Sequence, residues 1–253
     1  MIEVTHLSKR FGAAQVLSDI NAVFESGKVN QVIGKSGSGK SVLVKCIVGL
    51  YVPEEGQVLY DGRSFHTLEK EEKRQVRQEI GMLFQSSALF DSLTVMENVM
   101  FPLKMFATMG PAEMTDRAHL CLKRVNILGK ENAYPAEISG GMQKRVGIAR
   151  AIAMNPKYLF VDEPNSGLDP QTSILIDNLI SDLTEEYNTT TVVVTHDMNS
   201  VMEAGDNIVF IHEGKAWWKG SREELLVSDN KELNEFIFAS GLMRQVKAAM
   251  KRG

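Results

Sequence analysis

The sequence has only two cysteines, Cys46 and Cys121, and neither lies in a metal-binding spacing. Since both lie in apolar, helix-like segments, we expect reduced, buried thiols in a cytoplasmic protein. No run approaches the roughly 18 consecutive apolar residues of a membrane-spanning helix. The first residues also lack the charged start and apolar block of a signal peptide. If the protein works at a membrane, we expect another protein to hold it there.

An excess of positive charge is also absent. The chain has 28 Lys and Arg against 32 Asp and Glu, a net charge of −4, which disfavours a nucleic-acid-binding face. With 43% hydrophobic and 24% charged residues, the composition is that of an ordinary globular protein. A chain of 253 residues can bury a continuous core as one large α/β domain, with or without a subdomain.

Short apolar runs alternate with helical segments along the chain. Strands are expected at 2–7, 29–33, 57–60, 80–84, 158–161, 191–194 and 207–211, and helices at 40–50, 112–125, 141–153 and 171–186. Several of these strands are almost continuously apolar, which is typical of parallel strands buried on both faces. The alternation predicts an α/β fold with a mainly parallel sheet flanked by helices.

Residues 93–137 break this alternation. They include Pro102, Pro111 and Pro135 and no convincing strand. We interpret them as part of a helical subdomain of about residues 93–153, inserted into an α/β domain of residues 1–240.

A glycine-rich run, GKSGSGKS at residues 34–41, matches the phosphate-binding pattern G-x-x-x-x-G-K-[ST]. It lies between an expected strand and an apolar helix, which is the context that this pattern requires. The glycines let consecutive N–H groups point at phosphate oxygens, and the helix adds its positive N-terminal end. Lys40 is expected to reach the β- and γ-phosphates, and the Ser41 hydroxyl to bind magnesium. The rest of the cradle would be Gly34, Lys35, Ser36, Gly37, Ser38 and Gly39.

A second run, KYLFVDEP at residues 157–164, places Asp162 and Glu163 at the carboxyl end of a buried strand, where α/β sheets bind ligands. Asp162 is suited to hold magnesium through a water. Glu163 could polarise an attacking water as general base. An apolar strand that ends in Asp-Glu often simply enters a polar loop, but the phosphate-binding run favours the catalytic interpretation.

The stretch ISGGMQKRVGIARA, residues 138–151, supplies a second helix start suited to an anion. Ser139 is a natural N-cap, and Gly140 and Gly141 remove side-chain bulk from the first turn. A lone S-G-G would indicate an N-cap and nothing more. Here the text resembles the signature sequence of ATP-binding-cassette (ABC) proteins, usually LSGGQ, and the family's other motifs follow in order between residues 2 and 220.

The resemblance implies roles for four further residues. Gln85 corresponds to the Q-loop glutamine, beside the magnesium, and Asp169 in NSGLDP corresponds to the D-loop acid. His196 would contact the γ-phosphate as the switch histidine, and Phe11 would stack on adenine. In this family each nucleotide, ATP with Mg²⁺, lies between the phosphate loop of one subunit and the signature helix of another. The resemblance therefore implies a homodimer or a paired ATPase subunit, and an antiparallel β subdomain beside the P-loop NTPase sheet.

Two residues depart from the family pattern. Met142 replaces the usual glutamine of the signature, although Gln143 follows it, and Asn165 stands where many relatives carry Thr or an aromatic residue. Neither has a catalytic role, so ATP hydrolysis is still expected. The Met142 change is a candidate for tuning its rate.

The segment GMLFQSSALFDSLTVMENVMFPL, residues 81–103, closely resembles the ATPase subunits of Mla (maintenance of lipid asymmetry) phospholipid-transport systems. This resemblance implies a separate multi-pass permease, an MCE-domain substrate-binding protein, only indirect contact with phospholipid, and no nucleic acid. It places the chain peripherally on the cytoplasmic face of the inner membrane. The alternatives are a small-solute import ATPase and a soluble ABC ATPase. The short segment between Lys40 and Asp162, which has no heptad run, disfavours the soluble ATPase.

Two features remain open between structural and functional interpretations. Five methionines recur after residue 95, and their flexible thioethers suit either a groove for a partner's helix or ordinary core filling: Met96, Met100, Met105, Met109 and Met114. Residues 241–253 are expected to form a basic C-terminal helical tail. It either frays in solvent or packs on a neighbouring subunit through an apolar stripe as an ATP-independent tether.

Overall fold

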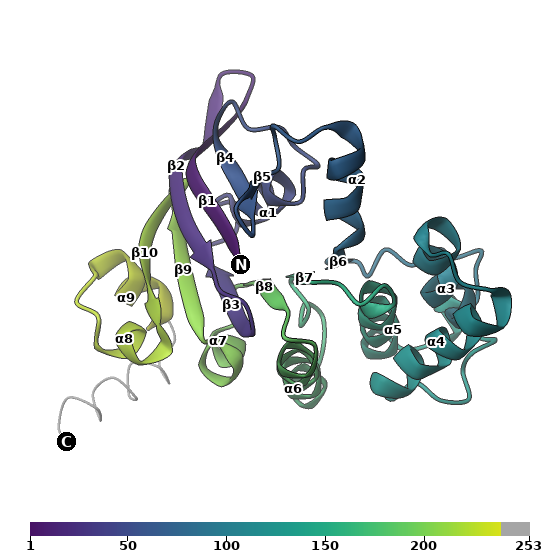
Figure 1. Cartoon of the computed structure of the whole chain (residues 1–253). Helices are drawn as coiled ribbons and strands as arrows, with labels where there is room; N and C mark the ends of the chain where they lie inside the picture. Colours follow the sequence, from purple (N-terminus) through teal and green to yellow (C-terminus); the bar gives the residue numbers. More distant parts are fainter. Residues whose placement is uncertain (239–253) are drawn as a thin grey trace. The chain divides into compact units, whose positions relative to one another are not determined.

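The computed structural model describes residues 1–238, so the expected tail at 241–253 lies outside the described residues. The described residues form two compact units. Figure 1 labels their helices and strands. Of the described residues, the first unit comprises 1–25, 30–66 and 194–238, and the second comprises 26–29 and 67–193. Within the described part of the chain, no helix is long and apolar enough to cross a bilayer.

The first unit contains a four-stranded antiparallel sheet in the order β2-β1-β4-β5. Its strands are β1 (Ile2–Phe11), β2 (Ala14–Phe24), β4 (Glu55–Tyr60) and β5 (Arg63–Ser64). The strands expected at 2–7 and 57–60 therefore belong to this sheet and not to the parallel one. Only residues 12 and 13 join β1 to β2, and so short a connection allows only an antiparallel pair. The antiparallel sheet that the family resemblance implies is present.

The same unit holds three strands in the order β10-β9-β3. β3 (Lys28–Ile33) runs parallel to β9 (Asn207–His212), and β10 (Lys215–Ser221) returns antiparallel to β9. α1 (Lys40–Ile47) follows β3 after a short loop. α7 (Met198–Ala204), α8 (Arg222–Val227) and α9 (Lys231–Ile237) complete the unit. Its apolar core includes Ile33, Val201, Phe210, Leu225 and Leu233.

The second unit is built on three strands in the order β8-β7-β6. β6 (Ile80–Leu83) pairs in parallel with β7 (Tyr158–Asp162), and both β7 and β8 (Thr190–Thr195) are buried throughout. Its helices are α2 (Lys70–Gln78), α3 (Val95–Phe106), α4 (Pro111–Arg124), α5 (Gly140–Ile152) and α6 (Pro170–Tyr187), with a 3-10 turn at Pro135–Glu137. The described residues 93–137 contain helices and no strand.

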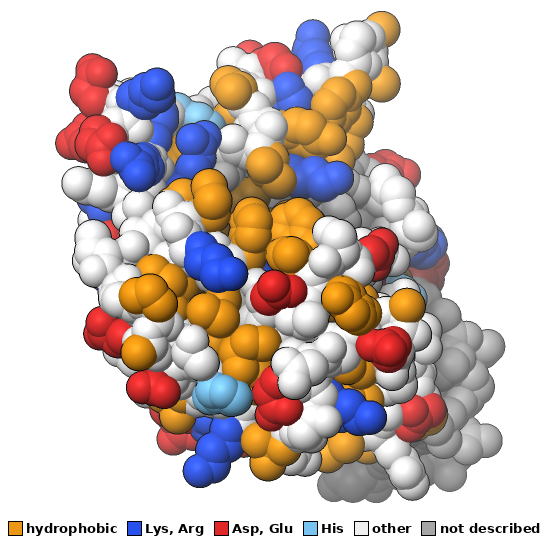
Figure 2. All heavy atoms as spheres, turned by 90° about the vertical axis from the view of Figure 1, so that its right-hand side faces the viewer, with side chains coloured by type: hydrophobic (Ala, Val, Ile, Leu, Met, Phe, Trp, Pro, Cys, Tyr) orange, Lys and Arg blue, Asp and Glu red, His pale blue; other side chains and the backbone are white. Residues whose placement is uncertain are grey.

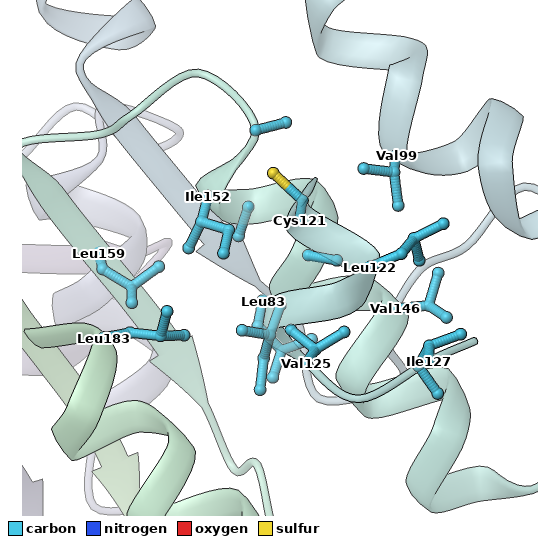
Figure 3. Packing of buried hydrophobic residues seen from close by; sticks show 14 of the residues in the cluster. Leu83, Val99, Cys121, Leu122, Val125, Ile127, Val146, Ile152, Leu159 and Leu183 are labelled. Carbon is cyan, nitrogen blue, oxygen red and sulfur yellow. The ribbon is translucent and has the colours of Figure 1, made fainter. Parts of the chain in front are cut away.

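One apolar cluster holds the second unit together. Figure 3 shows side chains from β6, α4, α5, β7 and α6 meeting in it, among them Leu83, Leu122, Val146, Leu159 and Leu183. Helix α5 lies directly against β6, because a Cβ added at Gly81 would come within 2.3 Å of the carbonyl oxygen of Ala151. This close contact fixes the C-terminal part of α5, the helix that begins at the signature run, against the start of β6.

Candidate functional site

The phosphate-binding loop spans residues 34–39, and α1 begins at Lys40. Its backbone needs glycine: Gly39 has φ 107°, and a Cβ at Gly34 would lie 2.3 Å from the carbonyl oxygen of Ile211. Lys40 is buried, and its ammonium donates hydrogen bonds to the carbonyls of Gly34 at 2.9 Å and Lys35 at 3.2 Å. The loop backbone therefore surrounds the buried ammonium of Lys40 at the start of α1.

The state of the Ser38 hydroxyl indicates that this loop fits a phosphate. Its oxygen is buried and has no hydrogen-bond partner among the described residues. Buried hydroxyls are normally paired, so a ligand oxygen would complete this one. Ser36 and Gly37 on the rim of the loop are exposed. An orphaned hydroxyl, a cation and a helix N-terminus together fit the phosphates of a nucleotide.

Phe11 ends β1 with its ring 44% exposed. Tyr51 packs edge-on against it with ring centroids 5.2 Å apart, and the ammonium of Lys9 lies 5.2 Å from the ring centre. These contacts fix the ring while leaving much of its surface open, as stacking on a nucleotide base requires.

The end of β7 presents the two carboxylates expected there. Asp162 is buried, and the half-buried Glu163 next to it has a left-handed backbone with φ 50°. Such a conformation is uncommon outside glycine and concentrates at functional sites. Its carbonyl accepts a hydrogen bond from the N–H of Ser166 at 3.3 Å, which closes a turn after the strand. The backbone therefore leaves the direction of the strand at Glu163.

The signature run forms the start of α5 as predicted. The hydroxyl of Ser139 accepts a hydrogen bond from the N–H of Met142 at 3.3 Å and caps the helix. Gly141 meets α6 closely, since a Cβ there would lie 2.7 Å from the methyl carbon of Thr172. A hollow of about 280 Å³ is lined by the signature residues and by residues 167–169. The structure thus brings the signature and the D-loop onto one face of the second unit.

Asp169 also stabilises the start of helix α6 on this face. It caps α6, accepting hydrogen bonds from the N–H of Thr172 at 3.0 Å and from its hydroxyl at 2.5 Å. The hydroxyl bond is the main cause of the lowered pKa of Asp169, so the carboxylate is ionised when it caps the helix.

Gln85 and His196 follow β6 and β8, respectively, and both side chains are exposed. The carbonyl of Gln85 accepts a hydrogen bond from the ammonium of Lys144 on α5, which also donates to the carbonyl of Glu163 at 3.3 Å. Burial lowers the pKa of Lys144, and the negative charges of Asp162 and Glu163 oppose this shift. Sequence reasoning missed Lys144. The available signal was its spacing from Gly147 and Ala151, which puts all three on one face of the helix.

The three residues predicted to bind the metal belong to different units: the half-buried Ser41 in the first turn of α1 lies in the first, and the buried Asp162 and the exposed Gln85 lie in the second. All three offer oxygen donors, which is the chemistry that Mg²⁺ prefers, with few protein ligands beside phosphate oxygens. When bound, the ion would supply positive charge for the β- and γ-phosphates.

A sequence model of a known family, described as "ABC transporter", matches residues 17–166. The chain belongs to the ABC transporter ATPase family. It is 36% identical over 93% of its length to the "Probable ribonucleotide transport ATP-binding protein mkl" of Mycobacterium leprae, covering 68% of that protein. It is 37% identical over 94% of its length to the "Methionine import ATP-binding protein MetN" of Clostridioides difficile, covering 74% of that protein.

A solved structure described as "Dimeric Structure of MJ0796, a Bacterial ABC Transporter Cassette" superimposes with a TM-score of 0.80 and 34% identity. The match covers 87% of this chain and 98% of that one. The predicted P-loop NTPase fold is therefore confirmed. The chain is an ATP-binding subunit of a transporter and hydrolyses ATP.

Proposed function

We propose that this ABC ATPase dimerises on ATP and thereby drives a separate permease. The observation that carries the proposal is the pair of anion-binding helix starts, one at Lys40 in the first unit and one at Ser139 in the second. One chain needs both if it contributes half of each of two nucleotide sites in a dimer. The similarity to a cassette described as dimeric supports this arrangement.

In this proposal each residue has a defined task. Lys40 stabilises charge on the β- and γ-phosphates, and the exposed Ser139 end of α5 binds the γ-phosphate held by the partner subunit. Glu163 accepts a proton from the attacking water, and His196 contacts the γ-phosphate. Loss of that phosphate removes the bridge between subunits, so hydrolysis shifts the population from closed to open dimers.

An apolar groove of about 430 Å³ in the second unit is our proposed docking site for the permease. Its lining includes four phenylalanines from α3 and the segment after β6, together with two arginines: Phe84, Phe90, Phe101, Phe106, Arg77 and Arg150. Figure 2 views the side on which α3 and α4 lie in Figure 1, and hydrophobic side chains gather across this face. Phe90, Phe101 and Phe106 remain 36–44% exposed, which suits an amphipathic helix of a partner.

Asn98 explains how the groove keeps its shape. It is fully buried, and its side chain binds the N–H and carbonyl of Phe90 and the carbonyls of Leu93 and Thr94, at 2.8–3.1 Å. The methionine series, by contrast, does not line the groove. Met96, Met100, Met109 and Met114 pack against the core of the second unit, which favours core filling for them.

For the cargo, we propose phospholipid, handled by the permease and an MCE-domain protein. The support is the resemblance of residues 81–103 to Mla ATPases. The second candidate is import of a small solute, favoured by the similarity to the methionine-import ATPase. Either cargo places the chain on the cytoplasmic face of the inner membrane, bound to its permease.

The experiment is mass-spectrometric identification of what co-purifies with tagged Glu163→Gln protein from solubilised source membranes in ATP and magnesium. The matched control is Lys40→Ala, which lacks the phosphate-binding cation. A permease with an MCE-domain protein and bound phospholipid would support the lipid proposal. A permease with a solute-binding protein would support solute import. Ribosomes or nucleic acid without a membrane protein would overturn the transporter proposal while leaving the ATPase intact.

A further inference from the structure

Helix α5 contacts the backbone of two candidate site residues through one side chain. Lys144 is only 5% exposed, and its ammonium donates to the carbonyls of Gln85 and Glu163, the latter at 3.3 Å. A lysine ammonium has three donors and no acceptor, so it can hold several carbonyls at once. The signature helix, the loop after β6 (residues 84–90, the Q-loop) and the end of β7 therefore meet at a single buried cation within the second unit.

Arg150, further along the same helix, holds the next part of the Q-loop. Its guanidinium donates to the carbonyls of Ser87 and Ala88, both at 2.7 Å. Ser87 has φ 60° and Ala88 has φ 46°, and Glu163 has φ 50°. Left-handed backbone is unfavourable for residues other than glycine, so these positions need external support. Charge-assisted hydrogen bonds are stronger than neutral ones and can supply it.

The helix also touches the loop sterically. A Cβ added at Gly147 would lie 2.5 Å from a methyl carbon of Leu83 and 3.6 Å from Cβ of Ser87. Residues 144, 147 and 151 lie on one face of α5, and this face packs on β6 and the loop after it. Helix α5, β6 and the loop after β6 thus form one packed body, and Lys144 and Arg150 bond the loop to the helix.

We propose that Lys144 and Arg150 are positioning residues that fix the Q-loop and the backbone of Glu163 to helix α5. Through them, the Ser139 end of the helix, the Q-loop and the Glu163 carboxylate move together within each chain. Because Arg150 also lines the docking groove, occupancy of the groove acts on the same body. The inference rests on the roles proposed above for Gln85 and Glu163.

The test uses Lys144→Met in the full-length protein, which keeps an unbranched side chain and removes the ammonium. We expect faster hydrogen–deuterium exchange in peptides covering 84–90 and 162–169. We expect kcat to fall about 10- to 100-fold, since catalytic groups would be misplaced. The Kd for ATP should stay within about twofold, because the P-loop bonds of Lys40 are untouched. Lys144→Arg keeps hydrogen-bond donors, so it should recover part of the lost kcat and part of the wild-type protection from exchange.

The matched control is Lys123→Met, which removes an exposed lysine from α4 and should leave exchange and kcat as in the wild type. Wild-type exchange and kcat in Lys144→Met would overturn the proposal. Equal losses of ATP affinity and kcat without a local change in exchange would also overturn it. If Lys144→Met does not fold, Arg150→Lys replaces it, with exchange read over residues 86–90. Normal hydrolysis by Glu163→Gln would instead contradict the general-base role, and the exchange result would stand separately.

Discussion

The side-chain amide of Asn165 donates to both carboxylate oxygens of Asp177, at 2.9 and 3.0 Å, and both residues are at least 90% buried. Asn165 lies two residues after Glu163, and Asp177 lies in the middle of α6. The pair therefore ties the loop that carries the candidate general base to the helix behind it. The departure from the family pattern at residue 165 is thus matched by a partner on α6.

Replacing Asp177 by Ala should destabilise the protein by about 1–3 kcal/mol, because the buried amide of Asn165 loses both acceptors. Urea unfolding would measure this change in the free energy of unfolding. Asp177→Asn keeps one acceptor oxygen and should lose less. In a double-mutant cycle with Asn165→Ala, we expect a coupling energy of about 0.5–3 kcal/mol. Additive single-mutant effects would contradict a direct interaction.

Cys46 should be inert toward thiol reagents in the native protein. Burial raises its pKa to about 11, and burial also raises the pKa of Cys121. At pH 8 only about one Cys46 thiol in a thousand would be ionised. A disulfide reagent should therefore modify both cysteines only after unfolding, whereas an exposed Asn132→Cys variant should react at once. Rapid modification of the wild type under native conditions would refute this prediction.

The raised pKa of Cys46 also gives a pH dependence of stability. The folded state holds the thiol proton more tightly than the unfolded state, whose thiol titrates near the ordinary value of 9.0. The contribution of Cys46 to stability is therefore intact below about pH 9 and is lost as pH rises toward 11. The difference in unfolding free energy between the wild type and Cys46→Ala should change across this window in that direction.

The sequence predicts most reliably those elements whose local chemistry sets their conformation. The glycines of residues 34–39 and the apolar run of β7 act within a few positions, and both elements form as expected. Strand β2 was missed because polar residues interrupt its apolar ones, as in an outer sheet with one solvated face. Lys144 was missed because a lysine in a helix usually faces solvent, and only the tertiary structure buries it, with its ammonium bonded to the carbonyls of Gln85 and Glu163.

Ser139→Arg should block the dimer and spare nucleotide binding. The exposed helix start would carry a bulky cation, while the phosphate loop at residues 34–41 is unchanged. In the Glu163→Gln background we expect a monomer in ATP and magnesium by light scattering, with the Kd for ATP within about twofold. Ser139→Ala is the control: it removes only the hydroxyl that caps α5, at a cost of about 1 kcal/mol, and adds no bulky cation that could block the dimer. A dimer in the Arg variant would contradict the proposed γ-phosphate contact of Ser139.

Phe90→Asp combined with Phe106→Asp should abolish association with the permease and leave ATP binding intact. Both side chains are 42–44% exposed in the groove, so the change places charge on an apolar docking surface at little cost to folding. Met100 on the same helix is left unchanged, because its side chain packs against the core. Co-purification from membranes would measure the loss. Leu120→Asp combined with Leu128→Asp is the matched control, because these side chains are 53% and 64% exposed outside the groove. If the groove variant retained the permease, docking would have to occur on another surface of the chain.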